Sequence, residues 1–475
     1  MTSFPEPRPT PALLGLDLGS SSLKALVLDL EGRVLAVRSA SYPTRAPAPG
    51  WAEQSLDDWW SACGEATRAA VSAAPDAEVV GIGLSGQMHT FVLLDAAGAP
   101  VRPAITWMDT RAAGLLPEVV ERVRAAGLAG ELANPVVLGL SLPPLAWLHA
   151  HEPATLARAR TLLLAKDALR ARLTGEVGSE PTDASATLLF DVAGRRWSRA
   201  TFDAFGLPLE LAPPLGEADA EAGRLADEAA RHLGLPAGIP VAFGAGDQQA
   251  AAVGTGTVRA GQAQLMVGTG AQALVVEAAP PTDVDAGLHA FCHVRGWLRQ
   301  ASVNNAGVAL GWAGRTLGLA WSELYGALGD DPPPSAPLFL PYLTGERAPL
   351  MKGHARGGWL ALEPGHDRAA LARAAVAGVV AAIADGMRSL PGDPDRRVRA
   401  GGGGLQDARF AQAVADASGA TLDLLDAADA SAVGAALLGG VAAGVHADVE
   451  AAVAAQASAI ARTLRQRPER AAAWT

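Results

Sequence analysis

The sequence predicts an α/β fold made of two related domains that face each other across a cleft. First, 475 residues are too many for one ordinary hydrophobic core. Second, an apolar run, a glycine- and hydroxyl-rich tip and another apolar run occur twice, in ALLGLDLGSSSLKALVLD and in GQAQLMVGTGAQALVVE. Third, RRVRAGGGGLQDARFAQAVADASGATLDLL is typical of a strand, a glycine loop, a helix and a strand.

Composition excludes several classes of protein. The net charge is −11 and no basic block occurs, so the chain is not expected to bind nucleic acid or an anionic membrane. The charge-free stretches 374–384 and 430–445 are shorter than the roughly 18–20 residues of a membrane span, and we expect buried helices there.

The cysteines and the N-terminus indicate a reducing compartment. Cys63 and Cys292 are the two cysteines, and they lack the CxxC spacing of a zinc site or a disulfide framework. The first eleven residues, MTSFPEPRPTP, are rich in proline and lack the apolar core of a signal peptide. We therefore expect a disordered arm over 1–11 and a cytoplasmic protein.

The tip of the first repeat carries groups that suit a phosphate. Residues 17–22 supply a carboxylate from Asp17, free backbone N–H groups and three hydroxyls, and Lys24 follows two residues later. Such groups can hold a metal-bound polyphosphate, with Asp17 facing the metal. The pattern is not GxxxxGK[ST], and a plain serine-rich hairpin is the alternative. Only Lys24, Lys166 and Lys352 are lysines, so Lys24 is a sparingly used residue type.

The stretch FGAGDQQAAAVGTG over 243–256 contains the candidate catalytic base. It follows the strand-like run IPVAF and breaks at Gly244 and Gly246 just before Asp247. A carboxylate at such a strand end faces a cleft in many α/β folds, so we interpret Asp247 as a base. Alternatively, Asp247 caps the following helix QQAAAVG.

Two further strand ends carry groups for a small polar ligand. The run GIGLSG resembles a dinucleotide fingerprint, but TFVLLD after it predicts a strand where that motif requires a helix. Gln87, Met88 and His89 follow the first strand, whereas Trp107 and Asp109 follow the next. Hydrogen-bonding groups beside a flat apolar wall suit a hydroxylated ligand. A purely structural His89 is the alternative.

Other polar residues have weaker interpretations. Asp183, in TDASATLLFDV, either caps a helix or contacts a ligand. His149 and His151 would diverge on a helix, so we do not expect them to bind metal. LHAFCHV around Cys292 alternates as a strand does, which disfavours a metal site there as well.

Taken in order, the motifs resemble those of the FGGY carbohydrate kinases, and of xylulokinases most closely. They are DLGSSSLK, SGQMH, GAGDQQAAAVGTG, VGTGAQA, LPYLTGERAP and GGGG before a helix, and the resemblance runs from about residue 12 to 445. The resemblance implies two ribonuclease-H-like, actin-like ATPase domains flanking a central cleft. It also implies transfer of the γ-phosphate of Mg-ATP to a sugar hydroxyl.

The resemblance assigns domains and site residues. It implies a sugar-binding domain over 12–252, a nucleotide-binding domain over 253–446 and a helical tail over 447–475. It places the catalytic base at Asp247. The implied ligand contacts are as follows: for ATP and phosphate Asp17, Gly19, Ser20, Ser21, Lys24, Gly268, Thr269, Gly270, Gly401, Gly402 and Gly403, and for sugar Met88, His89, Trp107, Asp109, Asp247 and Gln248. Magnesium would reach Asp17 through phosphate or water.

Departures from the xylulokinase pattern leave the acceptor open. Where those kinases usually have QMHG, LWND, GDN and GTSG, this chain has QMHT with Thr90, TWMD with Met108, GDQ with Gln248 and GTGA. D-xylulose is the first acceptor to consider, and ribulose, sedoheptulose, glycerol and pentitols are alternatives. A non-catalytic actin-like ATPase or sugar sensor is a second class. Oligomeric state is open, with a homodimer as one state.

Overall fold

The computed structural model describes residues 9–281, 287–328, 337–393, 395–425, 429–456, 460–471 and 474. These residues form two compact units. The first comprises the described residues within Met1–Val258, Phe291–Arg295 and Asp429–Ala457. The second comprises those within Arg259–Ala290, Gly296–Ala428 and Ser458–Thr475.

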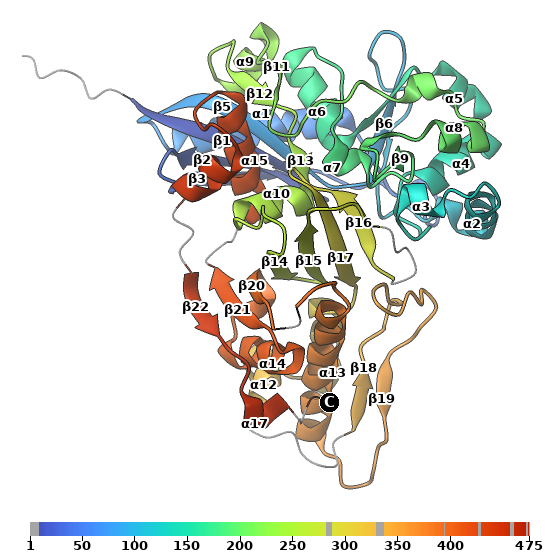
Figure 1. The fold of residues 1–475 in the computed structure, drawn as a ribbon, viewed down its shortest axis with the longest axis vertical. Helices are drawn as coiled ribbons and strands as arrows, with labels where there is room; N and C mark the ends of the chain where they lie inside the picture. Colours follow the sequence, from blue (N-terminus) through green and yellow to red (C-terminus); the bar gives the residue numbers. More distant parts are fainter. Residues whose placement is uncertain are drawn as a thin grey trace, which may run out of the picture. The chain divides into compact units, whose positions relative to one another are not determined.

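A seven-stranded mixed sheet forms the core of the first unit (Figure 1). Its strands are β1 (Thr10–Leu18), β2 (Ser22–Asp29), β3 (Val34–Ser41), β5 (Ala77–Gly86), β11 (Glu221–Arg224), β12 (Pro240–Ala242) and β13 (Ala245–Gly246). The order is β11-β12-β5-β1-β2-β3, with β13 also paired to β5. Strands β1, β2 and β3 are antiparallel, whereas β5 runs parallel to β1 and β12 parallel to β5. The predicted hairpin is therefore confirmed.

The first unit also contains two smaller sheets and most of the helices. The smaller sheets contain β4 (Glu53–Gln54), β6 (Phe91–Leu94), β7 (Ala104–Ile105) and β8 (Thr161–Leu164), and β9 (Phe190–Asp191) with β10 (Arg196–Trp197). The helices are α1 (Leu56–Ser72), η1 (Arg111–Gly114), α2 (Leu116–Ala125), α3 (Ala129–Leu132), α4 (Leu142–His151), α5 (Pro153–Arg158), α6 (Ala165–Thr174), α7 (Pro181–Ala184), α8 (Arg199–Phe205), η2 (Leu209–Leu211), α9 (Asp227–Leu233), α10 (Asp247–Gly254), α15 (Ala430–Ala442) and α16 (Val449–Ala455).

Helix α15, distant in sequence, packs directly on β1, β5 and α10. The contact is backbone to backbone: a Cβ on Gly15 or Gly83 would overlap carbonyl oxygens of α15, and a Cβ on Gly434 would overlap the carbonyl oxygen of Ala250. The glycines of GIGLSG therefore make room for a helix. No helix follows them, because β5 ends at Gly86 and β6 begins at Phe91, so the strand predicted after GIGLSG is confirmed.

The second unit repeats the sheet topology of the first. The strands of its sheet are β14 (Ala263–Val267), β15 (Ala271–Glu277), β16 (His289–Cys292), β17 (Trp297–Val303), β20 (Arg397–Gly401), β21 (Thr421–Leu425) and β22 (Ile460–Leu464), and the last two residues of β16 are grouped with the first unit. The order is β16-β17-β15-β14-β20-β21-β22. In the first unit, the antiparallel strands β3, β2 and β1 are followed across the sheet by β5, which is parallel to β1, and by β12, which is parallel to β5. In the second unit, the antiparallel strands β17, β15 and β14 are followed in the same way by β20, which is parallel to β14, and by β21, which is parallel to β20. The predicted fold class, two ribonuclease-H-like α/β domains, is confirmed.

The remaining elements of the second unit cover this sheet. They are α11 (Gly307–Leu317), α12 (Trp321–Gly326), β18 (Leu338–Leu340), β19 (Gly358–Leu360), α13 (Arg368–Arg388), η3 (Gly403–Leu405), α14 (Ala408–Ser418) and α17 (Pro468–Ala471). Helix α13 is long and apolar enough to cross a membrane, but 61% of its most apolar 18-residue window is buried within the protein. Its buried side chains belong to the core of this unit, as the sequence predicts for 374–384.

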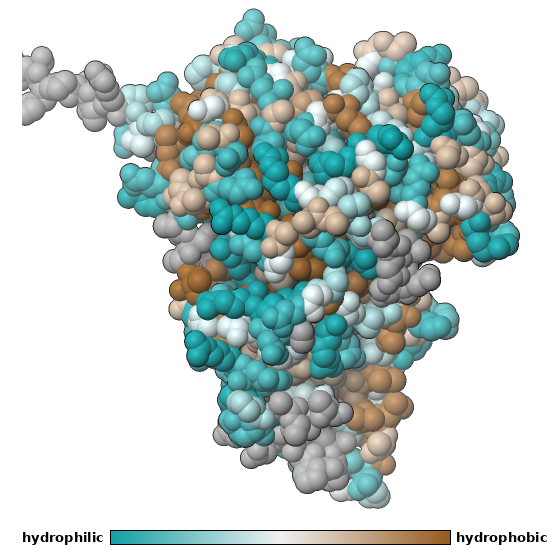
Figure 2. All heavy atoms as spheres, in the orientation of Figure 1, coloured by the Kyte–Doolittle hydropathy of each residue, from teal (hydrophilic) through white to brown (hydrophobic). Residues whose placement is uncertain are grey.

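The hairpin β18–β19 is apolar on both faces. On one face Phe339 and Trp359 stack with Trp312 of α11. The other presents exposed leucines, of which Leu338 and Leu360 are direct cross-strand partners, and Figure 2 shows apolar surface over this hairpin. Among the described residues of this unit, only one face of the hairpin is thus covered.

Two expectations about the chain ends differ from the structure. Thr10 and Pro11 already pair with Ala77 and Glu78, so β1 begins inside the arm predicted for 1–11, and residues 1–8 lie outside the described residues. The tail expected to be helical contains β22, which pairs with β21. The contiguous domain boundaries stay a prediction. Compactness groups α15 and α16 with the first unit because glycines let α15 approach β1 and β5 closely.

Candidate active site

The tip between β1 and β2 places its acid on the strand and its hydroxyls in the turn. Asp17 is the cross-strand partner of Lys24, and Ser85 of β5 donates a 2.7 Å hydrogen bond to Asp17 Oδ1. Burial raises the pKa of Asp17 despite this bond and the nearby Lys24 charge. The backbone N–H of Gly19 closes the turn on the carbonyl oxygen of Ser22 at 3.1 Å.

Three side chains distant in sequence hold this turn in place. The Tyr42 hydroxyl donates to the carbonyl oxygen of Gly19. The Gln54 amide donates to the carbonyl oxygen of Ser20 at 2.8 Å, and the Trp107 indole N–H donates to the Ser20 hydroxyl at 2.9 Å. The turn is therefore fixed from several directions, which a plain surface hairpin does not require.

The Lys24 ammonium is paired rather than free. Its Nζ lies 2.8 Å from Oδ1 of Asp429, directly before α15, with the two side chains 38% and 21% exposed. Burial lowers the pKa of Lys24, but the hydrogen bond and the charges of Asp429 and Asp17 outweigh it and raise the pKa overall. Lys24 is thus a cation with partly solvated carboxylate partners, which an anionic ligand could share.

Asp247 is the first residue of α10, directly after β13. The N-cap position is occupied by Gly246 and carries no side-chain capping bond, so the helix-cap alternative for Asp247 is wrong. Burial first, and then the Asp17 carboxylate, raise the pKa of Asp247 to about 7. Such a carboxyl group can hold and release a proton near neutral pH. Gln248 Nε2 lies 3.4 Å from its Oδ1.

Met88 and His89 lie just beyond β5, next to the strand that leads into α10. Gly86 of β5 pairs with Gly246 of β13, which brings the two strand ends together. His89 has a φ of 69°, uncommon for a non-glycine residue, and its Nδ1 lies 2.7 Å from the carbonyl oxygen of Ala186. Such strain is often found at ligand sites.

The second predicted strand end carries Trp107, whose side chain is partly exposed, and Asp109, whose carboxylate is already hydrogen-bonded. Trp107 is 38% exposed, which leaves part of its ring open to a ligand. Asp109 is 4% exposed, and its oxygens accept from the Arg111 guanidinium and, at 2.6 Å, from the Ala52 N–H. Its observed contacts are structural, and a sugar contact at Asp109 stays a prediction.

In the second unit the structure brings the two predicted loops together. Gly401 of β20 is the register partner of Met266 of β14, two residues before Gly268. A Cβ on Gly402, which has a φ of 96°, would overlap the carbonyl oxygen of Val267. The glycine loop over 401–403 therefore lies against the base of the second hairpin.

The start of α11 holds the tip of that second hairpin. The N–H groups of Gly307 and Val308 donate to the carbonyl oxygens of Gly268 and Thr269 at 3.1 and 2.9 Å. Residues Gly268 and Thr269 are exposed, so the tip is accessible to a ligand.

Several residues around the site carry no local signal in the sequence. Tyr42, Gln54 and Asp429 reach the first tip from 23, 34 and 405 positions away.

The sequence predicts that Asp183 caps a helix or binds a ligand. Instead Glu180 caps α7, so the cap interpretation of Asp183 is wrong. For Cys292 the predicted strand is confirmed, and within the described residues no three His, Cys, Asp or Glu side chains converge as a metal site.

Two α/β units of like topology, each with a glycine-rich hairpin tip, define the ribonuclease-H-like, actin-like class of folds. The model of the FGGY family of carbohydrate kinases, N-terminal domain, matches residues 12–254, and that of the C-terminal domain matches residues 263–443. The chain belongs to the FGGY family of carbohydrate kinases.

Known relatives extend over nearly the whole chain. The chain is 36% identical to the xylulose kinase of Escherichia coli (strain K12) over 438 residues, which cover 90% of each protein. A glycerol kinase of Dechloromonas aromatica (strain RCB) is 30% identical over 461 residues, covering 91% of this chain and 89% of that protein. The crystal structure of a "xyloylose kinase" from Brucella ovis superposes with a TM-score of 0.91 at 35% identity, covering 98% and 96% of the two chains.

Proposed function

We propose that the chain transfers the γ-phosphate of Mg-ATP to a sugar hydroxyl, with D-xylulose as the first acceptor and D-xylulose 5-phosphate as the product. The observation that carries this proposal is Asp247, a carboxyl group at the start of α10 whose pKa burial and Asp17 raise to about 7. In phosphoryl transfer a positioned carboxylate accepts the proton of the attacking hydroxyl.

In the first unit, Met88, His89, Trp107 and Gln248 would bind the sugar beside Asp247. Met88 packs with Ala186 and Phe291 and supplies an apolar contact. His89 and Gln248 offer polar groups at the strand and helix ends, and Trp107 offers a partly exposed ring. This mixture of a flat wall and hydrogen-bonding groups suits a polyhydroxylated ligand.

The first hairpin tip would hold the transferred phosphate. Gly19 closes the tight turn, Ser20 and Ser21 contribute hydroxyls, and Lys24 contributes a cation that Asp429 pairs at 2.8 Å. An incoming phosphate would share Lys24 with Asp429, neutralising charge at the transferring group.

Asp17 fits the role of a magnesium contact. Its carboxylate is held by the Ser85 hydroxyl at 2.7 Å, and its charge helps to raise the pKa of Asp247. Magnesium takes oxygen ligands, often one or two carboxylates completed by phosphate and water. When bound, the ion would supply positive charge for the phosphate, and Asp17 would orient it.

The second unit would bind the nucleotide. Gly268, Thr269 and Gly270 form the tip of the second hairpin, and the absence of side chains on the two glycines would let the phosphates approach its backbone closely. Gly401, Gly402 and Gly403 adjoin this tip and lack side chains, which permits the adenosine to approach the backbone closely.

The acceptor is the least determined part of the proposal, and glycerol is a specific alternative. Gln248 replaces the asparagine typical of xylulokinases and resembles glycerol kinases at that position. A second replacement is Thr90, which stands where xylulokinases usually have glycine. Thr90 is fully buried and its Oγ1 accepts from the backbone N–H of Trp107 at 3.2 Å, so this threonine helps to position the Trp107 ring. Other ketoses and pentitols are included as alternatives for the same reason.

One assay tests the function. ADP release from Mg-ATP is measured with D-xylulose, D- and L-ribulose, sedoheptulose, glycerol and pentitols, and the product is identified by phosphorus NMR. We expect D-xylulose to give the highest kcat/KM. Fastest turnover of glycerol supports the alternative acceptor. ADP release that no acceptor raises above background supports the second class, an actin-like ATPase or sugar sensor.

We expect a cytoplasmic enzyme with no nucleic-acid or membrane partner, and a homodimer is one oligomeric state to test.

A further inference from the structure

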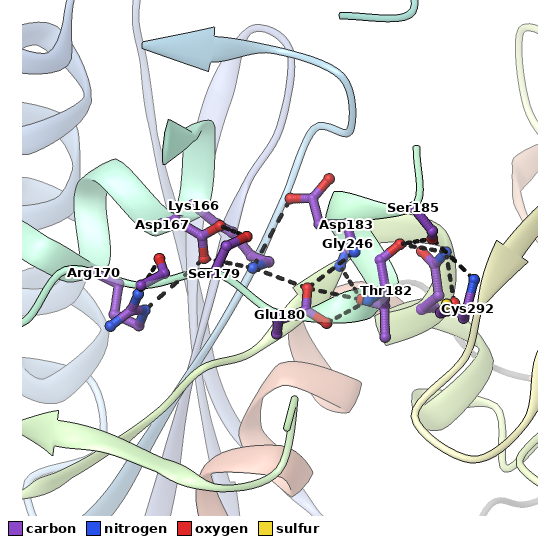
Figure 3. Close-up of polar contacts among 12 residues, drawn as sticks. Lys166, Asp167, Arg170, Ser179, Glu180, Thr182, Asp183, Ser185, Gly246 and Cys292 are labelled. Atoms are coloured by element: carbon purple, nitrogen blue, oxygen red, sulfur yellow. Dashed lines mark hydrogen bonds and ion pairs between the residues drawn. The ribbon is translucent and has the colours of Figure 1, made fainter. Parts of the chain in front are cut away.

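A buried ion network is centred on Lys166 and is linked through Glu180 and Thr182 to Gly246, the residue before Asp247 (Figure 3). Lys166 of α6 is fully buried, and its Nζ lies 2.7 Å from Asp167 Oδ1, 3.1 Å from Glu180 Oε1 and 3.9 Å from Asp183 Oδ2. Burial lowers the pKa of Lys166, but the three carboxylates outweigh it and raise the pKa overall. Buried ion networks often add little net stability, so the groups that this network positions are the more informative feature.

Glu180, which pairs with Lys166, also accepts a hydrogen bond from the hydroxyl group of Thr182. Its carboxylate accepts from the Thr182 N–H at 2.6 Å, from the Thr182 hydroxyl at 2.9 Å and from the Asp183 N–H at 3.0 Å. A hydroxyl has one hydrogen to donate and two lone pairs that accept. Because Glu180 takes the hydrogen, the lone pairs of Thr182 Oγ1 are available to a donor on another element.

That donor is the backbone N–H of Gly246, which lies 3.1 Å from Thr182 Oγ1. Gly246 directly precedes Asp247. On the other side of the acid, the Gln249 amide donates to the carbonyl oxygen of Thr182 at 3.2 Å. Thr182 therefore contacts the chain immediately before Asp247 and two residues after it.

The same turn also reaches the candidate sugar residues. The carbonyl oxygen of Ala186 lies 2.7 Å from His89 Nδ1, and Met88 packs against Ala186. Lys166 itself packs under β5, since a Cβ on Gly86 would approach Lys166 Cβ to 3.0 Å. The buried turn that contains Thr182 and Ala186 thus contacts both the end of β13 and the residues that follow β5.

We propose that Thr182 is a positioning residue for Asp247, and that Lys166 and Glu180 act through it by orienting its hydroxyl. This inference rests on the proposed function, in which Asp247 is the base. Without the hydroxyl acceptor, Gly246 loses a buried partner and the start of α10 can shift. A displacement of about 1 Å at a reacting group can lower the rate about a hundredfold.

The test compares three variants of the same turn. Thr182→Val removes the acceptor while keeping the shape of the side chain, and Thr182→Ser keeps the hydroxyl. Thr187→Val is the matched control, because Thr187 is equally buried and its hydroxyl bonds only within the turn, to the Ala184 carbonyl oxygen and the Leu189 N–H.

Steady-state kinetics provide the first readout. We expect Thr182→Val to lower kcat about 30-fold or more while the KM for ATP changes less than about threefold. Thr182→Ser restores kcat to within about threefold of wild type. Thr187→Val lowers the melting temperature to a similar degree but leaves kcat within about threefold of wild type.

Hydrogen exchange of the segment 244–250 provides a second readout that needs no substrate. We expect faster exchange at Gly246 in Thr182→Val and wild-type exchange in Thr187→Val. An active wild type with unchanged kcat in Thr182→Val, or an equal kcat loss in Thr187→Val, overturns this inference alone. A wild type that phosphorylates no acceptor overturns the proposed function and, with it, the catalytic role of Thr182.

Discussion

The indole N–H of Trp107 donates a 2.9 Å hydrogen bond to the hydroxyl of Ser20. This bond joins the wall proposed for the sugar to the hairpin tip proposed for the phosphate, across 87 positions of sequence. Trp107 is also tied to Thr90, whose hydroxyl accepts from its backbone N–H. A change in the wall is therefore expected to affect the phosphate tip as well.

Trp107→Phe tests this connection. Phenylalanine keeps an apolar ring but lacks the N–H, so we expect kcat/KM for the acceptor to fall about fivefold, the effect of one lost neutral hydrogen bond of about 1 kcal/mol. Trp107→Ala also removes the wall and should fall by a further factor of about ten or more. Equal values for wild type, Trp107→Phe and Trp107→Ala in acceptor kinetics would contradict a role for the wall.

The rate should depend on the ionisation of Asp247. Burial and the Asp17 carboxylate raise the pKa of Asp247 to about 7, and only the ionised form can accept a proton. We therefore expect kcat/KM for the acceptor, at saturating Mg-ATP, to rise with pH and level off above about pH 7 to 8. A profile that stays flat from pH 5.5 to 9, or whose midpoint lies near pH 4, would show that the ionisation of Asp247 does not control the rate.

Not all of this site could be predicted from the sequence. The tip at 17–22 and Asp247 have local patterns, a glycine-rich turn between apolar runs and an acid after a strand, and these patterns place them at strand ends. The repeated hairpin also indicates the duplicated sheet, because one apolar-tip-apolar unit produces the same antiparallel pairing in both units.

The partners of those residues depend on tertiary packing. Asp429 meets Lys24 because α15 packs on β1, which requires glycine at Gly15, and no local pattern connects these positions. Asp109 is a polar residue at a strand end, as a ligand contact would be, yet Arg111 two residues later occupies it. Competition between a neighbouring guanidinium and a ligand is decided by side-chain geometry rather than spacing.

Gln248 is the residue where we expect acceptor preference to change. Its Nε2 lies 3.4 Å from Asp247 Oδ1, next to the proposed base. Gln248→Asn restores the residue typical of xylulokinases, and we expect the ratio of kcat/KM for D-xylulose to that for glycerol to rise about tenfold, corresponding to about 1.4 kcal/mol. An unchanged ratio in paired assays at the same Mg-ATP concentration would exclude Gln248 from acceptor selection.

The close packing of α15 can be tested through stability. A Cβ on Gly434 would overlap the carbonyl oxygen of Ala250, so Gly434→Ala should lower the free energy of unfolding by about 3 kcal/mol or more. Gly114→Ala is the control, because a Cβ there meets no atom within 4 Å. We expect the control to change stability by less than about 0.5 kcal/mol. Equal denaturation midpoints for the two variants would contradict the observed packing.

Phosphoryl transfer by Asp247→Asn tests the central claim most directly. With saturating Mg-ATP and the preferred acceptor, we expect kcat to fall about a thousandfold, because asparagine cannot accept the proton of the attacking hydroxyl. The Kd for ATP, measured by calorimetry on the same preparation, should stay within about threefold of wild type. Near-normal turnover of Asp247→Asn with intact ATP binding would show that another group is the base.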